Sequence, residues 1–153
     1  MPPADNRSPG TYFLASTPKL QPLYNLEALS LHEAIPGHHL QNAIAMELNV
    51  PEFRRTLSHS AFGEGWALYT ERLGKEAGFY QSPYSDFGRL GYEMWCGSAF
   101  AGWIPVFMPL AGAVKKAIDY LASHTALPQS AVEDQIDRYI SWPGQALSYK
   151  MGG

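Results

Sequence analysis

The stretch that most restricts what this chain can fold into is residues 32–39, where a Pro-Gly pair interrupts a helical metal-site pattern. In the pattern His-Glu-x-x-His, one helical turn places two imidazoles on the same face, and the Glu beside the first activates water at a bound zinc ion. Here the second histidine comes late, because His38 and His39 follow His32 by six and seven residues. An unbroken helix would point His38 away from His32 and would place His39 two turns away. The chain must therefore break between them.

Pro36 and Gly37 supply that break. The proline ring removes a backbone donor, and the glycine allows backbone dihedrals that other residues avoid. The extra residues can then bulge out and return His38 to the metal. We predict that His32 and His38 bind Zn²⁺ and that Glu33 is the general base for the attacking water. Spacing alone leaves His39 open as the alternative ligand.

Three motifs stand out in the chain: His-Glu-x-x-Pro-Gly-His-x-x-Gln at residues 32–41, Glu-Gly-Trp-Ala-x-Tyr-x-Glu at 64–71 and Arg-Tyr-x-x-x-Pro-Gly-Gln-Ala at 138–146. Together they resemble the motifs of a large, mostly bacterial family, domain of unknown function 885, which is similar to the gluzincin metallopeptidases. The resemblance implies a mainly α-helical, zincin-like (gluzincin) metallopeptidase catalytic region. Family members are several hundred residues long, with these motifs in their C-terminal part. We therefore expect residues 1–153 to form a single domain that is a fragment of a larger all-α protein.

The resemblance implies that Glu64 is the third zinc ligand, on a second helix. It lies 26 residues after His38, which leaves room for a helix end and a turn. Two imidazoles and one carboxylate leave a fourth position for water, as a catalytic zinc requires. Glu71 lies two turns along the same face and could accept a hydrogen bond from a ligand imidazole. The alternative for Glu71 is an exposed side chain paired with Arg72 or Lys75.

The C-terminal motif supplies the remaining candidates, Arg138, Tyr139 and Tyr149. By resemblance to gluzincins, these residues could donate to a tetrahedral intermediate's oxyanion or hold a substrate carboxylate. We predict Tyr139 and Tyr149 as catalytic residues beside Glu33. The alternative is that residues 142–145 form a turn and that Tyr139 packs the last helix.

Apolar periodicity predicts a mainly helical chain, and no strand-like alternation persists. Gly78 is expected to stop the third helix and Ser130 to cap the last one. The expected helices run from about Tyr24 to the Pro-Gly break, then over residues 38–48, 53–77, 84–95, 115–123 and 131–140.

Residues 96–114 depart from the family pattern. No charged residue occurs between Glu93 and Lys115, and the stretch contains Pro105 and Pro109. Family members are expected to carry a charged segment containing Asp-Thr-Gly-x-His there. Reading the codons one base out of phase can rebuild that motif from Trp103 onward, so we predict a shifted reading frame that is restored near Lys115.

The composition limits the classes of partner that we expect this chain to bind. A net charge of -3 and a pI near 5.9 give no basic surface for nucleic acid. Two prolines and several glycines in the uncharged stretch argue against a membrane span. The hydrophobic fraction of 46% would leave apolar surface exposed in a truncated chain, through which it could oligomerise.

These observations predict a zinc-dependent hydrolase that cleaves peptide or small amide substrates. The competing prediction is a non-catalytic metal-binding or pseudoenzyme module that needs its missing N-terminal half or a partner. A carboxylate-bridged di-iron protein using Glu33, Glu64 and Glu71 is weaker, because the chain lacks paired Glu-x-x-His motifs.

Overall fold

The computed structural model describes residues 10–14, 22–106 and 113–152, with the backbone alone for 100–106 and 113. Its regular elements are all helices, which agrees with the predicted mainly α-helical class. In chain order they are η1 (Leu23–Asn25), α1 (Leu26–Glu33), α2 (His38–Glu47), α3 (Glu52–Thr56), α4 (Ser60–Glu76), α5 (Pro83–Val106), α6 (Ala113–His124), α7 (Gln129–Ser141), η2 (Gln145–Leu147) and α8 (Ser148–Met151).

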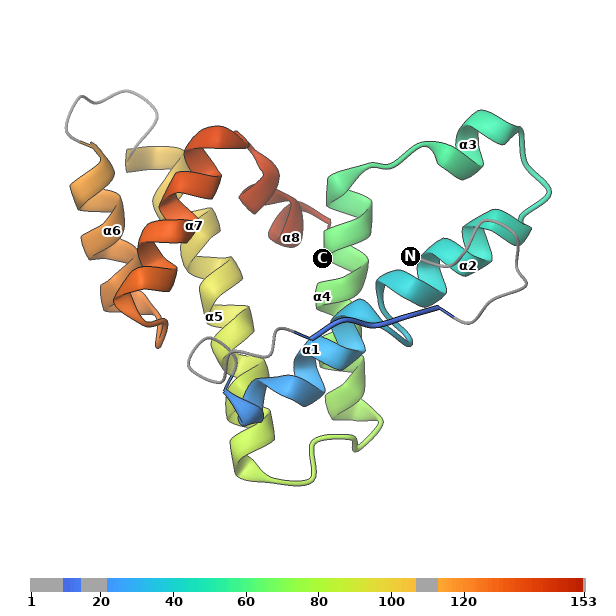
Figure 1. Cartoon of the computed structure of the whole chain (residues 1–153), viewed down its shortest axis with the longest axis horizontal. Coiled ribbons are helices and arrows are strands. Elements are labelled where there is room, and N and C mark those ends of the chain that lie inside the picture. Colours follow the sequence, from blue (N-terminus) through green and yellow to red (C-terminus); the bar gives the residue numbers. More distant parts are fainter. Residues whose placement is uncertain (1–9, 15–21, 107–112, 153) are drawn as a thin grey trace.

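Helices α1, α4 and α5 form the centre of the molecule, where α1 packs against both of the others (Figure 1). Helices α6 and α7 pack in sequence beside α5 and form one arm. Helix α2 contacts α4 and leads to α3 in the other arm. The short helix α8 contacts α4 and α5, so the C-terminal segment joins the two sides of the molecule.

The main hydrophobic core lies in the arm formed by α5, α6 and α7. Helical spacing places Leu121 four residues after Ala117, and Val132 four residues before Ile136, so each pair shares a face. These side chains are buried together with Ala99, Tyr139 and Ala146. A smaller buried set joins α1 to α4 and supports the helices that carry the predicted metal ligands; it consists of Ala28, Leu31, Ala67 and Leu68.

The structure corrects two of the expected helix boundaries. The helix predicted over residues 53–77 is two helices, because Leu57 and His59 have extended backbone dihedrals. Helix α3 buries none of its residues, so no packing holds it in line with α4. The prediction that Ser130 caps α7 is also wrong, since this helix begins at Gln129 after the N-cap residue Pro128. The predicted stop at Gly78 is confirmed by its left-handed φ of 76°.

Helix α5 is longer than its periodicity predicts and continues through Trp95 to Val106. It therefore runs into the uncharged stretch 96–114, whose residues 107–112 lie outside the described part of the chain. Among the helices that the structure describes, none combines the length and the apolar character needed to cross a bilayer. Cys96 in this helix is buried, and burial raises the pKa of its thiol to about 12, which favours an inert side chain.

Candidate metal centre

A tight bulge joins α1 to α2 and contains a cis peptide bond between Ile35 and Pro36. Gly37 closes this bulge against the end of α1. A Cβ atom at Gly37 would lie 1.8 Å from the carbonyl oxygen of His32, so this close approach requires glycine. The bulge returns His38 to His32, and the centres of their rings lie 4.8 Å apart.

Helix α4 holds the end of α1 and the bulge that follows it through two side-chain hydrogen bonds. The Thr70 hydroxyl donates to the carbonyl of Leu31 at 3.0 Å. The Trp66 indole Nε1 donates to the carbonyl of Pro36 at 2.9 Å. These bonds satisfy carbonyls that the end of α1 and the bulge leave without a helical partner. The same helix carries Glu64, so the bulge and the third predicted ligand share one support.

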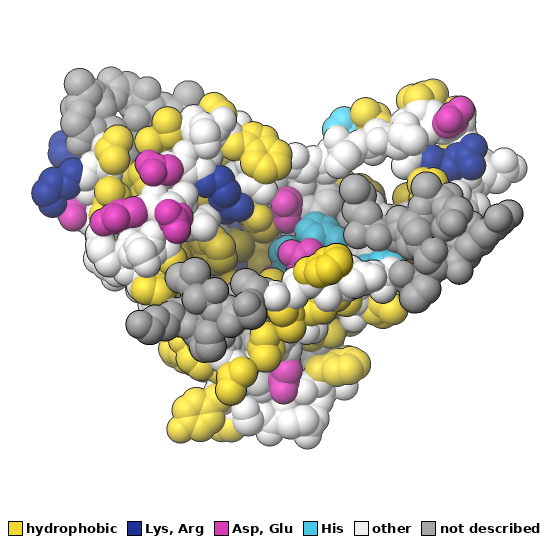
Figure 2. Space-filling model, in the orientation of Figure 1, with side chains coloured by type: hydrophobic (Ala, Val, Ile, Leu, Met, Phe, Trp, Pro, Cys, Tyr) yellow, Lys and Arg dark blue, Asp and Glu magenta, His cyan; other side chains and the backbone are white. Residues whose placement is uncertain are grey.

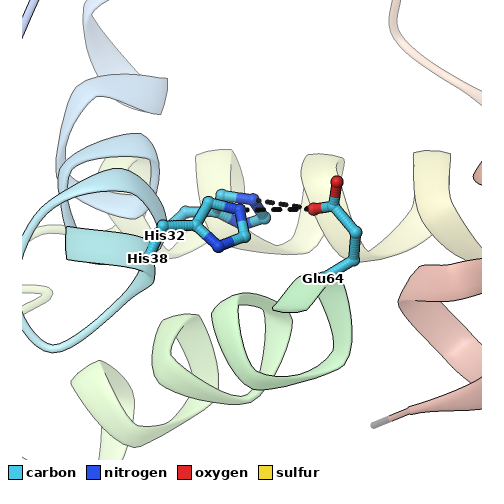
Figure 3. Close-up of side chains that lie close together, drawn as sticks. All are labelled: His32, His38 and Glu64. Atoms are coloured by element: carbon cyan, nitrogen blue, oxygen red, sulfur yellow. Dashed lines mark ion pairs between the residues drawn. The ribbon is translucent and has the colours of Figure 1, made fainter. Parts of the chain in front are cut away.

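His32, His38 and Glu64 point toward one another (Figure 3). Glu64 Oε2 lies 3.6 Å from His32 Nε2 and 3.3 Å from His38 Nε2. The three possible ligand atoms all lie within 4.8 Å of one another, which is close enough for them to hold one metal ion. His39 lies elsewhere, with its ring against Gly10. The geometry therefore favours His38 over His39, although the assignment of ligands stays a prediction.

Glu71 fixes the orientation of the first histidine. Its Oε1 lies 2.7 Å from His32 Nδ1, and the Glu71 side chain is almost completely buried. This confirms the predicted contact and excludes the exposed pairing with Arg72 or Lys75. When Nδ1 carries the proton of this hydrogen bond, the lone pair of Nε2 faces Glu64 and His38 and is free for a metal.

Gln145 orients the carboxylate of Glu64, a contact that sequence reasoning missed. Its Nε2 donates to Glu64 Oε1 at 2.9 Å and also approaches the hydroxyl of Tyr149 at 3.3 Å. The expected turn over residues 142–145 is present, with Gly144 at a left-handed φ of 84°. That turn carries Gln145 to the cluster formed by His32, His38 and Glu64. The only signal in the sequence was the place of this glutamine in the Pro-Gly-Gln-Ala motif.

The cluster favours a positive charge at its centre. Burial tends to lower the pKa of His32, but its hydrogen bonds to Glu64 and Glu71 outweigh burial and raise the pKa to about 9. Burial tends to raise the pKa of Glu64, but its contacts with the two histidines outweigh it and lower the pKa to about 2. For Glu71, burial prevails and raises the pKa. A metal cation at this place would replace the proton on His32.

A cavity of about 450 Å³ adjoins the cluster. The residues that line it include His32, Glu33 and Tyr149, and also Trp95 and Arg138. Figure 2 shows histidine and acidic side chains near the centre of this face, next to a hollowed and largely hydrophobic area. Glu33 is exposed, so its carboxylate can reach a molecule that enters the cavity.

Tyr139 also lines the cavity, but its side chain is 3% exposed and belongs to the hydrophobic core. Its hydroxyl accepts a hydrogen bond from Trp95 Nε1 at 2.9 Å. Burial raises the pKa of Tyr139. These contacts support the packing role that was its alternative, and a catalytic role for Tyr139 stays a prediction.

The chain resembles a solved structure and matches a family model. Its fold is similar to the crystal structure of "the putative lipoprotein from Colwellia psychrerythraea", with 37% identity and a TM-score of 0.80 over 85% of this chain. The chain spans 22% of the length of that protein. No curated protein matches it. The model of a family described as "bacterial protein of unknown function (DUF885)" matches residues 1–153, and the chain therefore belongs to this family.

Proposed function

We propose that this chain carries the metal centre of a zinc-dependent hydrolase, a metallopeptidase that cleaves peptide or small amide substrates. The observation that carries the proposal is the convergence of His32, His38 and Glu64 on one point, with their ligand atoms within 4.8 Å. Two imidazole nitrogens and one carboxylate oxygen are the donor set of catalytic zinc sites with an open position. The placement of the histidines at the junction of α1 and α2, and of Glu64 on the separate helix α4, supports the gluzincin relationship, which is part of the proposal.

A zinc ion held by these residues would supply Lewis-acid activation of water at neutral pH. Glu33, next to His32 and on the wall of the cavity, would accept a proton from the attacking water and pass it to the leaving amine. Glu71 keeps His32 in the tautomer that presents Nε2. Gln145 holds one oxygen of Glu64, which directs the other toward the two histidines.

Tyr149 is the better placed of the two predicted tyrosines to donate to the developing oxyanion. Its ring lies 6.2 Å from that of His32, and it lines the cavity beside the cluster. Burial raises the pKa of Tyr149, so its hydroxyl keeps the proton that an oxyanion donor must offer. The hydrogen bond from Gln145 to its oxygen fixes the direction of this hydroxyl.

The second candidate function is a non-catalytic metal-binding module, or a part that is active only within a longer chain. The observation that favours it is that this chain spans 22% of the related solved structure. The di-iron alternative is less consistent with the geometry, because the carboxylate of Glu71 is engaged by His32. Metal content distinguishes the zinc hydrolase from the di-iron alternative, since the first requires one zinc per chain and the second requires two irons.

The metal proposal is tested by comparing adjacent histidines. His38→Ala should abolish stoichiometric zinc binding, whereas the matched control His39→Ala should retain it, because only His38 faces Glu64. Zinc content after dialysis and competition with a chelating dye would give the two affinities. Equal loss in both variants, or loss only in His39→Ala, would show that the wrong imidazole was chosen.

The hydrolase proposal is tested at Glu33. Glu33→Gln should retain zinc and lose hydrolysis, because an amide of nearly the same shape cannot take a proton from water. The assay should use a longer family protein with the same motif and a library of peptide substrates. Zinc binding with substantial remaining turnover would remove Glu33 from the general-base role. Zinc binding without turnover in the unchanged protein would favour the non-catalytic module.

A further inference from the structure

The cavity beside the metal cluster has a cationic residue on its wall. Of the described residues that line it, Arg138 on α7 is the one that carries a lysine or arginine side chain. Its guanidinium carbon lies 5.5 Å from the centre of the Tyr139 ring and 5.9 Å from that of Trp95. Within the described part of the chain, no carboxylate lies within ion-pair distance of Arg138. The aromatic rings therefore hold this cation at the cavity without neutralising it.

Two buried polar atoms on the same wall lack hydrogen-bond partners among the described residues. They are Nε of Arg138, a donor, and Oε1 of Gln135, an acceptor. Gln135 lies three residues before Arg138 on α7, so both side chains share one face, and both line the cavity. Buried polar atoms without partners are costly, which makes a ligand that offers one acceptor and one donor favourable here.

We propose that this cavity binds a carboxylate of the peptide substrate at Arg138, an inference that rests on the proposed hydrolase function. A guanidinium presents paired N–H donors that match a carboxylate. A substrate N–H donates to Gln135, and an apolar or aromatic group of the substrate packs beside Trp95. The volume of about 450 Å³ suits a group of amino-acid size in a pocket of the ordinary ligand-binding range.

The acidic residues of the cavity define the charge of this ligand. Glu33, Glu71 and Asp134 also line it, so a second negative charge on the ligand would be repelled. A singly charged carboxylate therefore fits better than a phosphate group. This carboxylate has two possible sources in a peptide, the free C-terminus and the side chain of Asp or Glu. The first source would make the enzyme an exopeptidase, and the second would make it selective for acidic residues.

The experiment measures binding of three small probes to the whole chain by titration calorimetry, with a chelator present to remove metal. The probes are N-acetylphenylalanine, its amide, and the α-amide of N-acetylglutamate. The first carries an α-carboxylate, the second carries none, and the third carries only a side-chain carboxylate. Because no metal is present, the result does not depend on whether the cluster binds zinc, so this inference and the proposed function can fail separately.

We expect at least one carboxylate probe to bind about tenfold or more tightly than the uncharged amide. Arg138→Gln should remove this preference, whereas the matched control Arg54→Gln, on the exposed helix α3, should retain it. Preference for the first probe assigns a free C-terminus, and preference for the third assigns an acidic side chain. If neither carboxylate probe bound more tightly than the uncharged amide, or if no probe bound, the inference would be overturned. The comparison of probes on the unchanged chain needs no variant and stands even where Arg138→Gln unfolds.

Discussion

Replacing Gly37 by alanine should damage both the stability of the fold and the metal cluster. The added Cβ would lie 1.8 Å from the carbonyl oxygen of His32 and 2.4 Å from that of Leu31. Both atoms are backbone at the end of α1, so neither can rotate out of the way. Overpacking of this kind costs about 1–3 kcal/mol and occasionally more. Because the obstructing atoms are backbone, we expect a loss near the upper limit, about 3 kcal/mol or above.

For a chain of this length, that loss should lower the unfolding midpoint by roughly 6–12 °C. The second effect concerns the cluster, because relief of the contact must move the bulge that carries His38. We expect zinc affinity to fall by about tenfold or more, as when a ligand is displaced from its productive geometry. Thermal unfolding followed by circular dichroism and competition with a chelating dye would measure the two losses.

Gly91→Ala is the matched control. Gly91 lies inside α5, and a Cβ atom there would meet no heavy atom within 4 Å. This substitution should stabilise the protein by about 0.5–1 kcal/mol, because glycine is a poor helix former. Zinc affinity should stay unchanged. If Gly37→Ala behaved like Gly91→Ala, with equal or higher stability and normal zinc binding, the argument from close approach would be refuted.

Three further predictions concern the cluster and the uncharged stretch. Glu71→Gln should weaken zinc binding by about 10–100-fold in a chelator competition, as removal of outer hydrogen-bond partners does, whereas the exposed Glu76→Gln should not; equal affinities in the two variants would contradict the role of Glu71. In metal-free protein the pKa of His32 is raised from 6.5 to about 9, so the stability it contributes is complete below pH 6.5 and lost as pH rises through 9. Urea unfolding at several pH values should show this loss of stability. Calorimetry in two buffers should show that zinc binding near neutral pH releases a proton. Absence of both effects would refute the raised pKa of His32. Finally, coding DNA read one base out of phase across residues 96–114 should encode Asp-Thr-Gly-x-His, and a stop codon in that frame would exclude the shift.

Sequence periodicity predicted the helices that have one buried apolar face. It missed helix breaks and helix ends that depend on packing in the folded chain. Helix α2 begins at His38 as predicted, since the Pro-Gly break fixes its start. The separation of α3 from α4 was missed, because local propensity is similar on both sides of Leu57 and the break reflects the lack of buried contacts in α3. The continuation of α5 to Val106 was missed because an uncharged stretch shows no amphipathic period.

Motif resemblance together with short-range spacing predicted most of the candidate cluster. The family resemblance implied that Glu64 lies beside the histidines, and the seven-residue interval from Glu64 to Glu71 predicted that Glu71 shares its face; both carboxylates lie beside His32. The hydrogen bond from Gln145 to Glu64 joins residues 81 positions apart and depends on how α8 and the preceding turn pack against α4. No periodicity encodes such a contact, so it could only be found in the folded chain.

The division of the site between two stretches of chain has a consequence for how such proteins diversify. The three predicted ligands and Glu71 all come from α1, α2 and α4, within residues 26–76, whereas Arg138 and Gln135 belong to α7. Mutation can therefore reshape the cavity wall that we propose meets the substrate without changing the helices that carry the predicted ligands. The hydrogen bond between Gln145 and Glu64 connects these two stretches of the chain. A chimera that exchanges residues 113–152 between family members should therefore transfer substrate preference. The stretch that carries the predicted ligands should keep its metal affinity, provided that the hydrogen bond between Gln145 and Glu64 is preserved.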